Sequence, residues 1–222
     1  MNDLTVVYYS SCREDPVFEG KIRQALLDAI GDLPLISVTQ QPVDFGENIC
    51  VGDVGRSGHN VFRQYQIGVQ AATTRFVAPA ESDALYPPGW FASRPLSDDV
   101  LVRCVPVYLC FAGGYWAGKF WPKNHWEGAT MVSRDYVLRQ LDELLKDKPL
   151  WRDGVEVGPE GGDDHPCLFT TAKLAKWVSE VPAISFRTPG QMHKKACFKP
   201  KDAQETLPHW GTPDDLLRKF WQ

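Results

Sequence analysis

Two acidic residues separated by one position, Glu81 and Asp83, follow a short apolar run at residues 76–78. The apolar run predicts a buried strand, and the Pro-Pro-Gly sequence after the acidic pair predicts a rigid turn. Ligands bind at the carboxyl ends of strands in open α/β sheets. Carboxylates this close repel each other unless a proton or cation lies between them, and divalent cations favour carboxylate oxygens. The pair therefore indicates a divalent metal site, with a solvated acidic turn as the alternative.

The acidic pair needs a sheet to position it, and the sequence predicts one. Residues 4–9 are β-branched and aromatic, which is typical of a buried strand. Apolar residues at helical spacing predict a helix over residues 16–30, with Pro16 in its first turn and Gly31 at its C-terminal cap. A second strand at residues 35–38 completes a right-handed βαβ unit, which predicts a parallel sheet.

The rest of the chain continues the alternation of strands, helices and loops. Residues 39–59 show no periodicity and contain four glycines, so a functional loop without secondary structure is expected there. Helices are expected at residues 60–73, 133–145, 171–179 and 213–221. Strands are expected at residues 75–79, 100–111 (with a bend at Pro106), 128–132 and 183–186.

Composition limits the class of protein. The chain has 222 residues, enough for one α/β domain, and its net charge of −4 gives no global field that favours nucleic acid or membranes. Six scattered cysteines without a C-x-x-C pair argue against a zinc site and indicate reduced thiols. The N-terminal residues do not form a signal peptide, and no apolar run reaches the ~18 residues of a membrane helix. A cytoplasmic protein without a membrane segment is expected.

The segment at residues 54–91 resembles the donor half of GT-A glycosyltransferases, especially the family of chitin- and cellulose-type inverting enzymes. The elements of that family's pattern are matched in order by Asn60, the small residues Gly68, Ala71 and Ala72, the strand at residues 76–78, and Glu81-Ser82-Asp83 in place of Asp-x-Asp.

A longer string, residues 44–91, resembles small glycosyltransferase-like proteins of bacteriophages and viral metagenomes. Those proteins read Glu-Asp-Asp, followed by Leu-Tyr-Pro-Pro and His-Phe. In this chain Ser82 replaces the middle acid and Trp90 replaces the His.

The resemblance implies an α/β fold of the GT-A (Rossmann-like) type, with a mixed, mainly parallel sheet flanked by helices. It implies a single domain over residues 1–222, in which residues 1–98 form the nucleotide-sugar donor half, residues 99–186 the acceptor half and residues 187–222 a closing loop and helix. The implied activity is transfer of a sugar from a nucleotide-sugar, with a UDP-sugar favoured, to a hydroxyl acceptor. Bound Mn²⁺ or Mg²⁺ would neutralise the diphosphate as the sugar leaves.

The resemblance also implies site residues. The implied metal ligands are Asp83, Glu81 and His193, the last in a Gly-Gln-Met-His-Lys-Lys sequence that resembles the C-terminal loop of GT-A enzymes. Lys194 and Lys195 would stabilise the leaving diphosphate. The other residues expected around the nucleotide are Ser10, Ser11, Arg13, Asp44, Arg56, Asn60, Arg63 and Glu81.

An inverting transferase needs a general base for the acceptor hydroxyl. In related families this carboxylate follows a segment that residues 128–134 resemble, which favours Asp163 or Asp164, with Glu127 as a rival. Aromatic residues between Tyr115 and Trp126 offer flat faces to an acceptor, although core packing is the ordinary role of such residues.

The acceptor is open. A hydroxymethylated pyrimidine in phage DNA is attractive, with a local basic groove from residues 187–201, and saccharide, lipid or protein acceptors are alternatives. A nucleotidyltransferase is disfavoured because the SSCRED sequence after the first strand is not a glycine-rich phosphate loop. A non-catalytic nucleotide- or sugar-binding module is a third hypothesis, supported by Glu81 and Ser82. The oligomeric state is not predicted.

Overall fold

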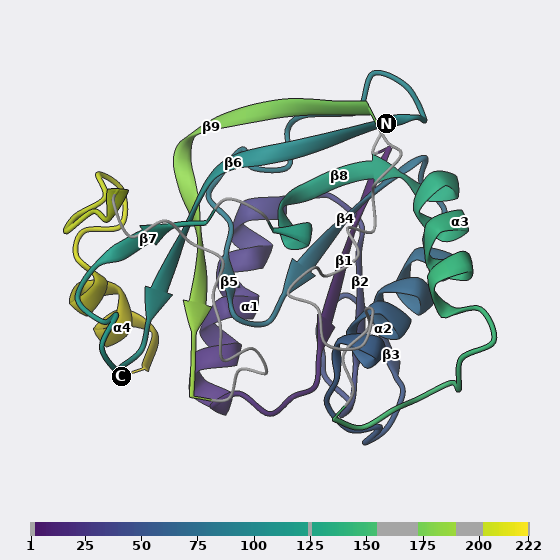
Figure 1. Ribbon diagram of the computed structural model, residues 1–222, viewed down its shortest axis with the longest axis horizontal. Helices are drawn as coiled ribbons and strands as arrows, with labels where there is room; N and C mark the ends of the chain where they lie inside the picture. Colours follow the sequence, from purple (N-terminus) through teal and green to yellow (C-terminus); the bar gives the residue numbers. More distant parts are fainter. Residues whose placement is uncertain (1–2, 124–125, 155–172, 190–201, 222) are drawn as a thin grey trace.

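The computed structural model describes residues 3–123, 126–154, 173–189 and 202–221 (Figure 1). The strands within these residues are β1 (Leu4–Ser10), β2 (Leu35–Thr39), β3 (Glu47–Cys50), β4 (Phe76–Glu81), β5 (Ala84–Leu85), β6 (Val100–Phe111), β7 (Phe120–Pro122), β8 (Thr130–Ser133) and β9 (Lys173–Arg187). The helices are α1 (Pro16–Ile30), α2 (Gly58–Ala71), α3 (Arg134–Leu145) and α4 (Pro213–Trp221), with a 3-10 turn, η1 (Glu127–Ala129).

The strands form one sheet in the order β3-β2-β1-β4-β8-β6-β9-β5, and β7 pairs with β6. β3, β2, β1 and β4 are parallel to one another. β8 joins this half antiparallel and connects it to β6, which runs parallel to β9 over most of its length. In Figure 1 the two long strands β6 and β9 bend together. The predicted α/β fold, with a mixed, mainly parallel sheet flanked by helices, is confirmed.

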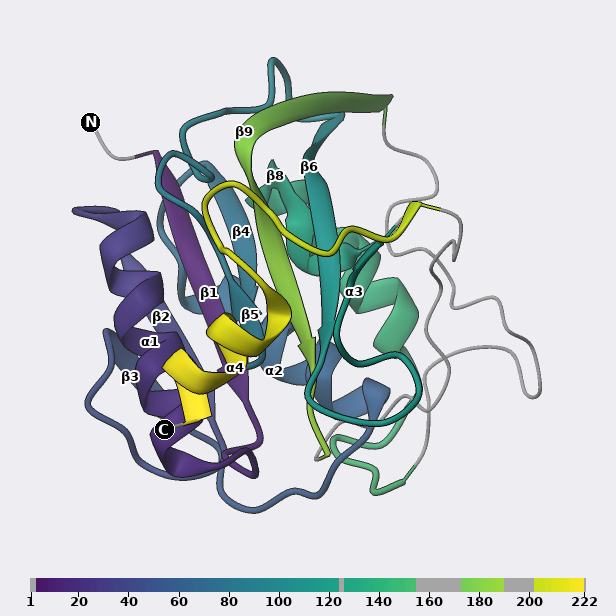
Figure 2. The ribbon, with the colours of Figure 1, turned by 90° about the vertical axis from the view of Figure 1, so that its left-hand side faces the viewer.

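Helices cover both faces of the parallel half (Figures 1 and 2). Side chains alternate along β1, as the period of a strand requires. Val6 and Tyr8 pack with Leu26 of α1, whereas Val7 and Tyr9 pack with residues of α2 and α3. β1 is therefore buried on both sides, which explains its continuous apolar sequence.

α1 has the predicted bounds, and residues at its two ends explain them. The Asp15 side chain caps the helix by accepting hydrogen bonds from the backbone N–H groups of Val17 and Phe18, both 3.0 Å long. Gly31, with φ at 56°, ends it. α2 begins two residues before its predicted start because the Ser57 hydroxyl caps it, accepting from the N–H of Asn60 at 3.1 Å.

The prediction that residues 39–59 contain no secondary structure is wrong in part. β3 lies within this segment and extends the sheet parallel to β2. Asn48 explains its placement, since its side-chain amide donates to the hydroxyl oxygens of Ser37 and Thr39, each at 2.8 Å. An exposed edge strand of four residues held by a polar side chain gives no apolar alternation in the sequence.

The predicted helix at residues 171–179 is also wrong for its described part. Residues from Lys173 onward form the first half of β9, paired with β6 from Val100. Partly buried and exposed residues alternate along this half, which is the period of a strand. The predicted strand at residues 128–132 is divided between η1 and β8, and Ser133 stands at the N-cap of α3 without a side-chain capping bond.

No described helix is long and apolar enough to cross a membrane. The four described cysteines, Cys12, Cys50, Cys104 and Cys110, are free thiols, and two of them are buried.

Candidate functional site

Glu81 is the last residue of β4 and lies beside Tyr9 of β1 in the parallel register. The Tyr9 hydroxyl donates to Glu81 Oε1 at 3.2 Å, and the indole N–H of Trp126 donates to Oε2 at 2.8 Å. The backbone N–H of Glu81 donates to the hydroxyl of Tyr86 at 3.1 Å. Each carboxylate oxygen thus accepts one hydrogen bond, and the carboxylate is fixed in one orientation at the carboxyl edge of the sheet.

Asp83 lies two residues further on, in the turn between β4 and β5, and is half-buried. No residue in the described part of the chain donates a hydrogen bond to its carboxylate. Burial, and then the charge of Glu81, raise the pKa of Asp83 to about 7. A partly buried carboxylate without a donor, beside a second carboxylate, is a site that a cation would stabilise.

Two basic residues face this acidic pair. The charges of Lys123 and Arg187 both act to lower the pKa of Asp83, against the effect of burial. Lys123 donates from Nζ to Ser185 Oγ at 3.3 Å, and its Nζ lies 4.7 Å from the centroid of the Trp126 ring. Ser185 and Arg187 belong to β9, which pairs with β5 directly after Asp83. The sheet therefore gathers opposite charges from segments far apart in the sequence.

The loop after β1 brings a third carboxylate, that of Glu14, close enough to act on Asp83. The hydroxyl of Thr188, next to the end of β9, donates to Glu14 Oε1 at 3.0 Å. Burial raises the pKa of Glu14, and the hydrogen bond from Thr188 opposes that shift. The charge of Glu14 in turn adds to the rise in the pKa of Asp83. The charges of Glu81 and Glu14 thus both act on Asp83 at the carboxyl ends of β1 and β4.

The carboxylates at this edge fit a divalent cation in chemical type, because Mn²⁺ and Mg²⁺ take oxygen ligands. Within the described residues no group of three or more His, Cys, Asp or Glu side chains forms a complete metal-binding cluster. The predicted third ligand, His193, lies outside the described residues. Lys194, Lys195, Asp163 and Asp164 lie outside them as well.

The predicted nucleotide residues near β1 lie at the same edge of the sheet. Ser10 ends β1, and its hydroxyl oxygen accepts from the N–H of Cys12 at 2.8 Å, which shapes the turn that contains Ser11. Arg13 forms an ion pair with Asp53, with 2.5 Å between Nη2 and Oδ1. Both side chains are largely exposed, so this pair can open to a ligand at small cost.

Asn60 and Arg63 have partners within the protein. The Asn60 side chain is 1% exposed; its amide donates to the carbonyl oxygens of Val54 and Gly55, and its Oδ1 accepts from the N–H of Arg152. These bonds give Asn60 the role of holding the loop before α2. Arg63 donates to Gln66 Oε1 at 2.7 Å, and Gln66 bonds Asp142 of α3, so Arg63 lies on the side of α2 that faces α3.

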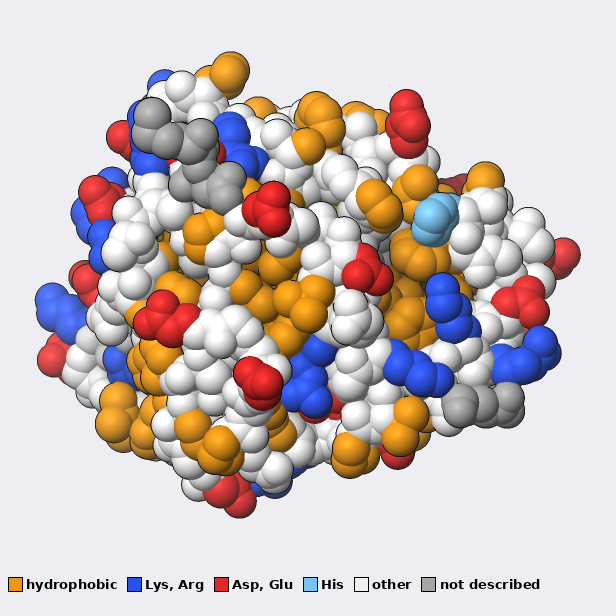
Figure 3. All heavy atoms as spheres, turned by 180° about the vertical axis from the view of Figure 1, so that it is seen from behind, with side chains coloured by type: hydrophobic (Ala, Val, Ile, Leu, Met, Phe, Trp, Pro, Cys, Tyr) orange, Lys and Arg blue, Asp and Glu red, His pale blue; other side chains and the backbone are white. Residues whose placement is uncertain are grey.

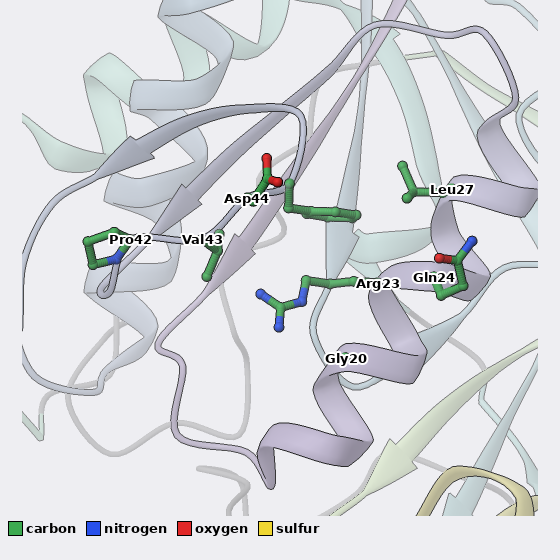
Figure 4. A pocket seen from close by; sticks show the side chains of 8 residues that line it. Gly20, Arg23, Gln24, Leu27, Pro42, Val43 and Asp44 are labelled. Atoms are coloured by element: carbon green, nitrogen blue, oxygen red, sulfur yellow. The ribbon is translucent and has the colours of Figure 1, made fainter.

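Arg56 and Asp44, both predicted to lie near the nucleotide, lie in different parts of the structure. The positive charge of Arg56 acts on Glu14, and its backbone N–H donates to Asp153 Oδ1 at 2.9 Å. Asp44 lines a shallow depression of about 410 Å³ against the middle of α1, together with Arg23 and Leu27 (Figure 4). The structure therefore brings Arg56 toward the acidic site and places Asp44 beside the middle of α1.

Two tyrosines, Tyr65 and Tyr9, lie between Glu127 and Glu81 of the acidic pair. The ring of Tyr9 meets that of Tyr65 edge-on, with 5.9 Å between centroids, and the charge of Glu127 contributes to raising the pKa of Tyr65 after burial. Sequence reasoning did not assign site roles to Tyr9 or Lys123, and it considered Trp126 only as an acceptor contact. Tyr9 could have been found from its position, since the last residues of adjacent parallel strands meet at one edge.

Comparisons with known proteins give the following result. No family model matches the sequence, and no curated protein matches it. Staphylococcus aureus TarS, solved with UDP-GlcNAc, has a TM-score of 0.49 and 10% identity, over 86% of this chain and 60% of that one. A glycosyltransferase involved in glycosylation of the major capsid of PBCV-1 has a TM-score of 0.37 and 13% identity, over 66% and 68%.

The bifunctional IspDF of Campylobacter jejuni has a TM-score of 0.44 and 9% identity, over 80% of this chain and 50% of that one. The chain thus spans about half to two thirds of the length of these structures. These values describe a partial likeness of fold, and no assignment of activity rests on them.

Proposed function

We propose that this protein is a metal-dependent glycosyltransferase, which moves a sugar from a nucleotide-sugar to a hydroxyl acceptor. The observation that carries the proposal is the half-buried Asp83 carboxylate, which has no hydrogen-bond donor among the described residues and lies beside Glu81 with Lys123 and Arg187 nearby. This arrangement would suit a divalent cation, which would supply positive charge to a diphosphate. The resemblance of residues 54–91 to the donor half of GT-A glycosyltransferases supports the same function.

In this proposal Asp83, with Glu81, holds Mn²⁺ or Mg²⁺. The ion would supply Lewis-acid neutralisation of the diphosphate as the sugar departs. Tyr9 and Trp126 keep Glu81 oriented, because each occupies one of its oxygens. Lys123 and Arg187 place positive charge where negative charge accumulates on the leaving nucleotide. His193, Lys194 and Lys195 would complete the site, and a UDP-sugar is the donor that we favour.

Each of the three predicted segments would have its own role. Residues 1–98 would bind the donor, residues 99–186 the acceptor, and residues 187–222 would close over both. Glu127, Asp163 and Asp164 are the candidates for the general base that takes the acceptor proton. A hydroxymethylated pyrimidine in phage DNA is one acceptor to test. In Figure 3 basic and acidic side chains of the described residues are interspersed over the face in view.

A second candidate function is a non-catalytic module that binds nucleotides or sugars. The observation that favours it is the engagement of both Glu81 oxygens by Tyr9 and Trp126, which leaves Asp83 as the carboxylate of the pair without such bonds. Such a module would bind a nucleoside diphosphate without turning over its sugar conjugate.

Thermal unfolding with Mn²⁺ and a panel of nucleoside diphosphates and nucleotide-sugars separates these possibilities. A ligand at a hundredfold excess over its dissociation constant stabilises the native state by about 2.7 kcal/mol, which is roughly 5–10 °C for a domain of this size. The shift should require both metal and one nucleotide. Asp83→Asn should abolish it, and Asp28→Asn, on the exposed side of α1, should retain it.

Loss of the shift in Asp83→Asn, together with release of nucleotide from the sugar donor by the wild type, would support the transferase. A shift without any nucleotide release would favour the binding module. If no panel member shifts the unfolding of the wild type, both proposals fail.

A further inference from the structure

The loop that follows α3, residues 149–154, is hydrogen-bonded to the start of α2. The Ser57 hydroxyl donates to the carbonyl oxygen of Arg152 at 2.7 Å, and the N–H of Arg152 donates to Asn60 Oδ1 at 2.9 Å. Ser57 and Asn60 are 3% and 1% exposed, so both bonds are shielded from water. We call residues 149–154 the docked loop.

A buried histidine, His59, also binds the docked loop. It is the second residue of α2 and is 1% exposed, and its Nε2 lies 2.9 Å from the carbonyl oxygen of Pro149. A carbonyl oxygen only accepts hydrogen bonds, so the contact assigns a proton to Nε2. The other ring nitrogen, Nδ1, is buried and has no hydrogen-bond partner among the described residues. The docked loop is therefore held by a neutral imidazole ring.

The surroundings of His59 disfavour a second proton on the ring. Burial lowers the pKa of His59, and the positive charges of Arg63 on α2 and Arg152 in the docked loop lower it further. The hydrogen bonds to carbonyl oxygens of the docked loop oppose this shift without reversing it. On α3, the carboxylate of Asp142 acts on Arg63. The first turn of α2 adds the positive end of a helix dipole, and a proton on Nδ1 would have no acceptor among the described residues.

The docked loop also holds the backbone of Arg56. The N–H of Arg56 donates to Asp153 Oδ1 at 2.9 Å, and its carbonyl oxygen accepts from the N–H of Gly154 at 3.0 Å. The two segments approach closely, since a Cβ on Gly55 would lie 2.6 Å from Asp153 Oδ1. The positive charge of Arg56 acts on Glu14 of the candidate site. Release of the loop would therefore free a basic residue beside that site.

We propose that His59 makes the docking of residues 149–154 sensitive to pH, and that the docked loop positions Arg56 for the nucleotide donor. The neutral ring keeps the loop on α2. The protonated ring is more stable in water than in its buried place, so the loop dissociates and Arg56 loses its backbone partners. His59 is thus a positioning residue that acts through the loop. The link to the donor rests on the proposed function, whereas the effect of pH on the loop does not.

Hydrogen exchange of backbone amides, measured by NMR, tests the loop without any ligand. The amides of Arg56, Arg152 and Gly154 all donate across the contact between the docked loop and residues 56–60. Because the pKa of His59 is lower in the docked state than in the open one, protons favour opening. Protection factors of the three amides should fall by up to tenfold per pH unit below the ordinary histidine pKa of 6.5, and should be constant above pH 7.5.

Two histidine variants assign the titrating group. The side-chain amide of His59→Gln can donate from the position of Nε2 but does not take up a proton, so this variant should keep its protection at pH 5.5. His209→Gln changes an exposed histidine that packs against Trp210, and should keep the pH dependence of the wild type. In the wild type, the ¹⁵N shifts of the His59 ring should show an Nε2–H tautomer at pH 7.5 and a doubly protonated ring over the range in which protection falls.

Calorimetry with UDP and Mn²⁺ at pH 5.5 tests the role of Arg56. The wild type should bind UDP about fivefold more weakly than His59→Gln, because both proteins share every other titrating group and differ in the population of docked loop. Equal UDP affinities would contradict the positioning of Arg56.

Protection that does not change with pH in the wild type, or a pH dependence that persists in His59→Gln, would overturn the inference. If neither protein binds UDP at any pH but the pH-dependent protection is observed, the proposed function fails and the pH-sensitive loop stands.

Discussion

Tyr9 and Glu81 are neighbours at the carboxyl ends of two adjacent parallel strands, and the tyrosine hydroxyl donates a 3.2 Å hydrogen bond to the carboxylate. The preceding residue, Tyr8, points to the opposite face and donates to Glu19 of α1 at 2.7 Å. Strand alternation has thus placed two similar tyrosine–glutamate pairs on opposite sides of one strand. One pair belongs to the candidate site, and the other belongs to the packing of α1.

The two pairs provide a matched test of positioning. Tyr9→Phe should lower the affinity for Mn²⁺ about tenfold, because a metal ligand that loses its supporting hydrogen bond is less well oriented. Tyr8→Phe should leave Mn²⁺ affinity unchanged. Both changes should lower the free energy of unfolding by roughly 1–3 kcal/mol, since each removes a hydrogen bond to a carboxylate. Urea unfolding and Mn²⁺ titration measure the two effects, and equal Mn²⁺ affinities in the two variants would contradict a role for Tyr9.

The pKa of Asp83 predicts how metal binding depends on pH. Because burial and Glu81 raise that pKa to about 7, the carboxyl group is protonated below pH 7 and a cation must displace its proton. Mn²⁺ affinity should fall about tenfold per unit between pH 7 and pH 5.5, and should be flat above pH 7.5. Asp83→Asn should show weak binding without this slope. A slope that persists in Asp83→Asn would assign the proton to another group.

The raised pKa of Asp83 has the opposite effect on the stability of the metal-free protein: lower pH weakens metal binding but favours folding. A carboxyl group with a raised pKa in the folded state binds its proton more tightly there than in the unfolded chain. Its contribution therefore improves as the pH falls from about 7 toward the ordinary value of 3.8. Thermal unfolding of the metal-free wild type, compared with Asp83→Asn over this range, measures that contribution. Added Mn²⁺ should stabilise the wild type and not Asp83→Asn at pH 7, and this extra stability should fade as the pH falls because protons displace the ion.

Local signals in the sequence were sufficient to predict many of the helices and strands. The bounds of α1, β6 and α4 follow the predicted residues because capping groups, apolar runs and helical spacing are local. Glu81 and Asp83 were identified from two residues after an apolar strand. Trp126, the second partner of Glu81, could not be found in this way, because it lies 45 residues further along the chain and reaches Glu81 across the sheet.

Asp44 and Asn60 show a second limit of prediction from sequence, because both were expected to line the nucleotide site. Asp44 follows a strand in sequence, which favours a place at the carboxyl edge, but the loop turns back so that β3 can begin beside Ile36. Asn60 has a residue type and position that suit ligand binding, yet all of its hydrogen-bonding groups are used by backbone atoms of neighbouring loops. Pairing partners that are distant in sequence decide both outcomes.

Gly68 tests how closely α2 approaches the sheet. A Cβ at this position would clash with Val7 Cγ1 and lie 3.1 Å from Val38 Cγ2. Gly68→Ala should therefore destabilise the fold by about 1–3 kcal/mol through overpacking. Gly20→Ala on α1, where a Cβ meets nothing within 4 Å, should instead stabilise it by about 0.5–1 kcal/mol. Urea unfolding of both variants measures the difference, and two changes of the same sign would contradict the close approach of α2.

Three carboxylates are candidates for the general base of the proposed reaction. Glu127 is the described candidate, half-buried near Tyr65 and the acidic pair, and Asp163 and Asp164 are the candidates from the resemblance. Removal of the base should lower the rate of sugar transfer by about 10²–10⁴-fold while donor binding stays intact. Glu127→Gln, Asp163→Asn and Asp164→Asn, each assayed for acceptor transfer and for the metal-dependent thermal shift, form a matched series. One variant that loses transfer and retains the shift identifies the base, whereas loss of both in Glu127→Gln would show that Glu127 supports the donor site instead.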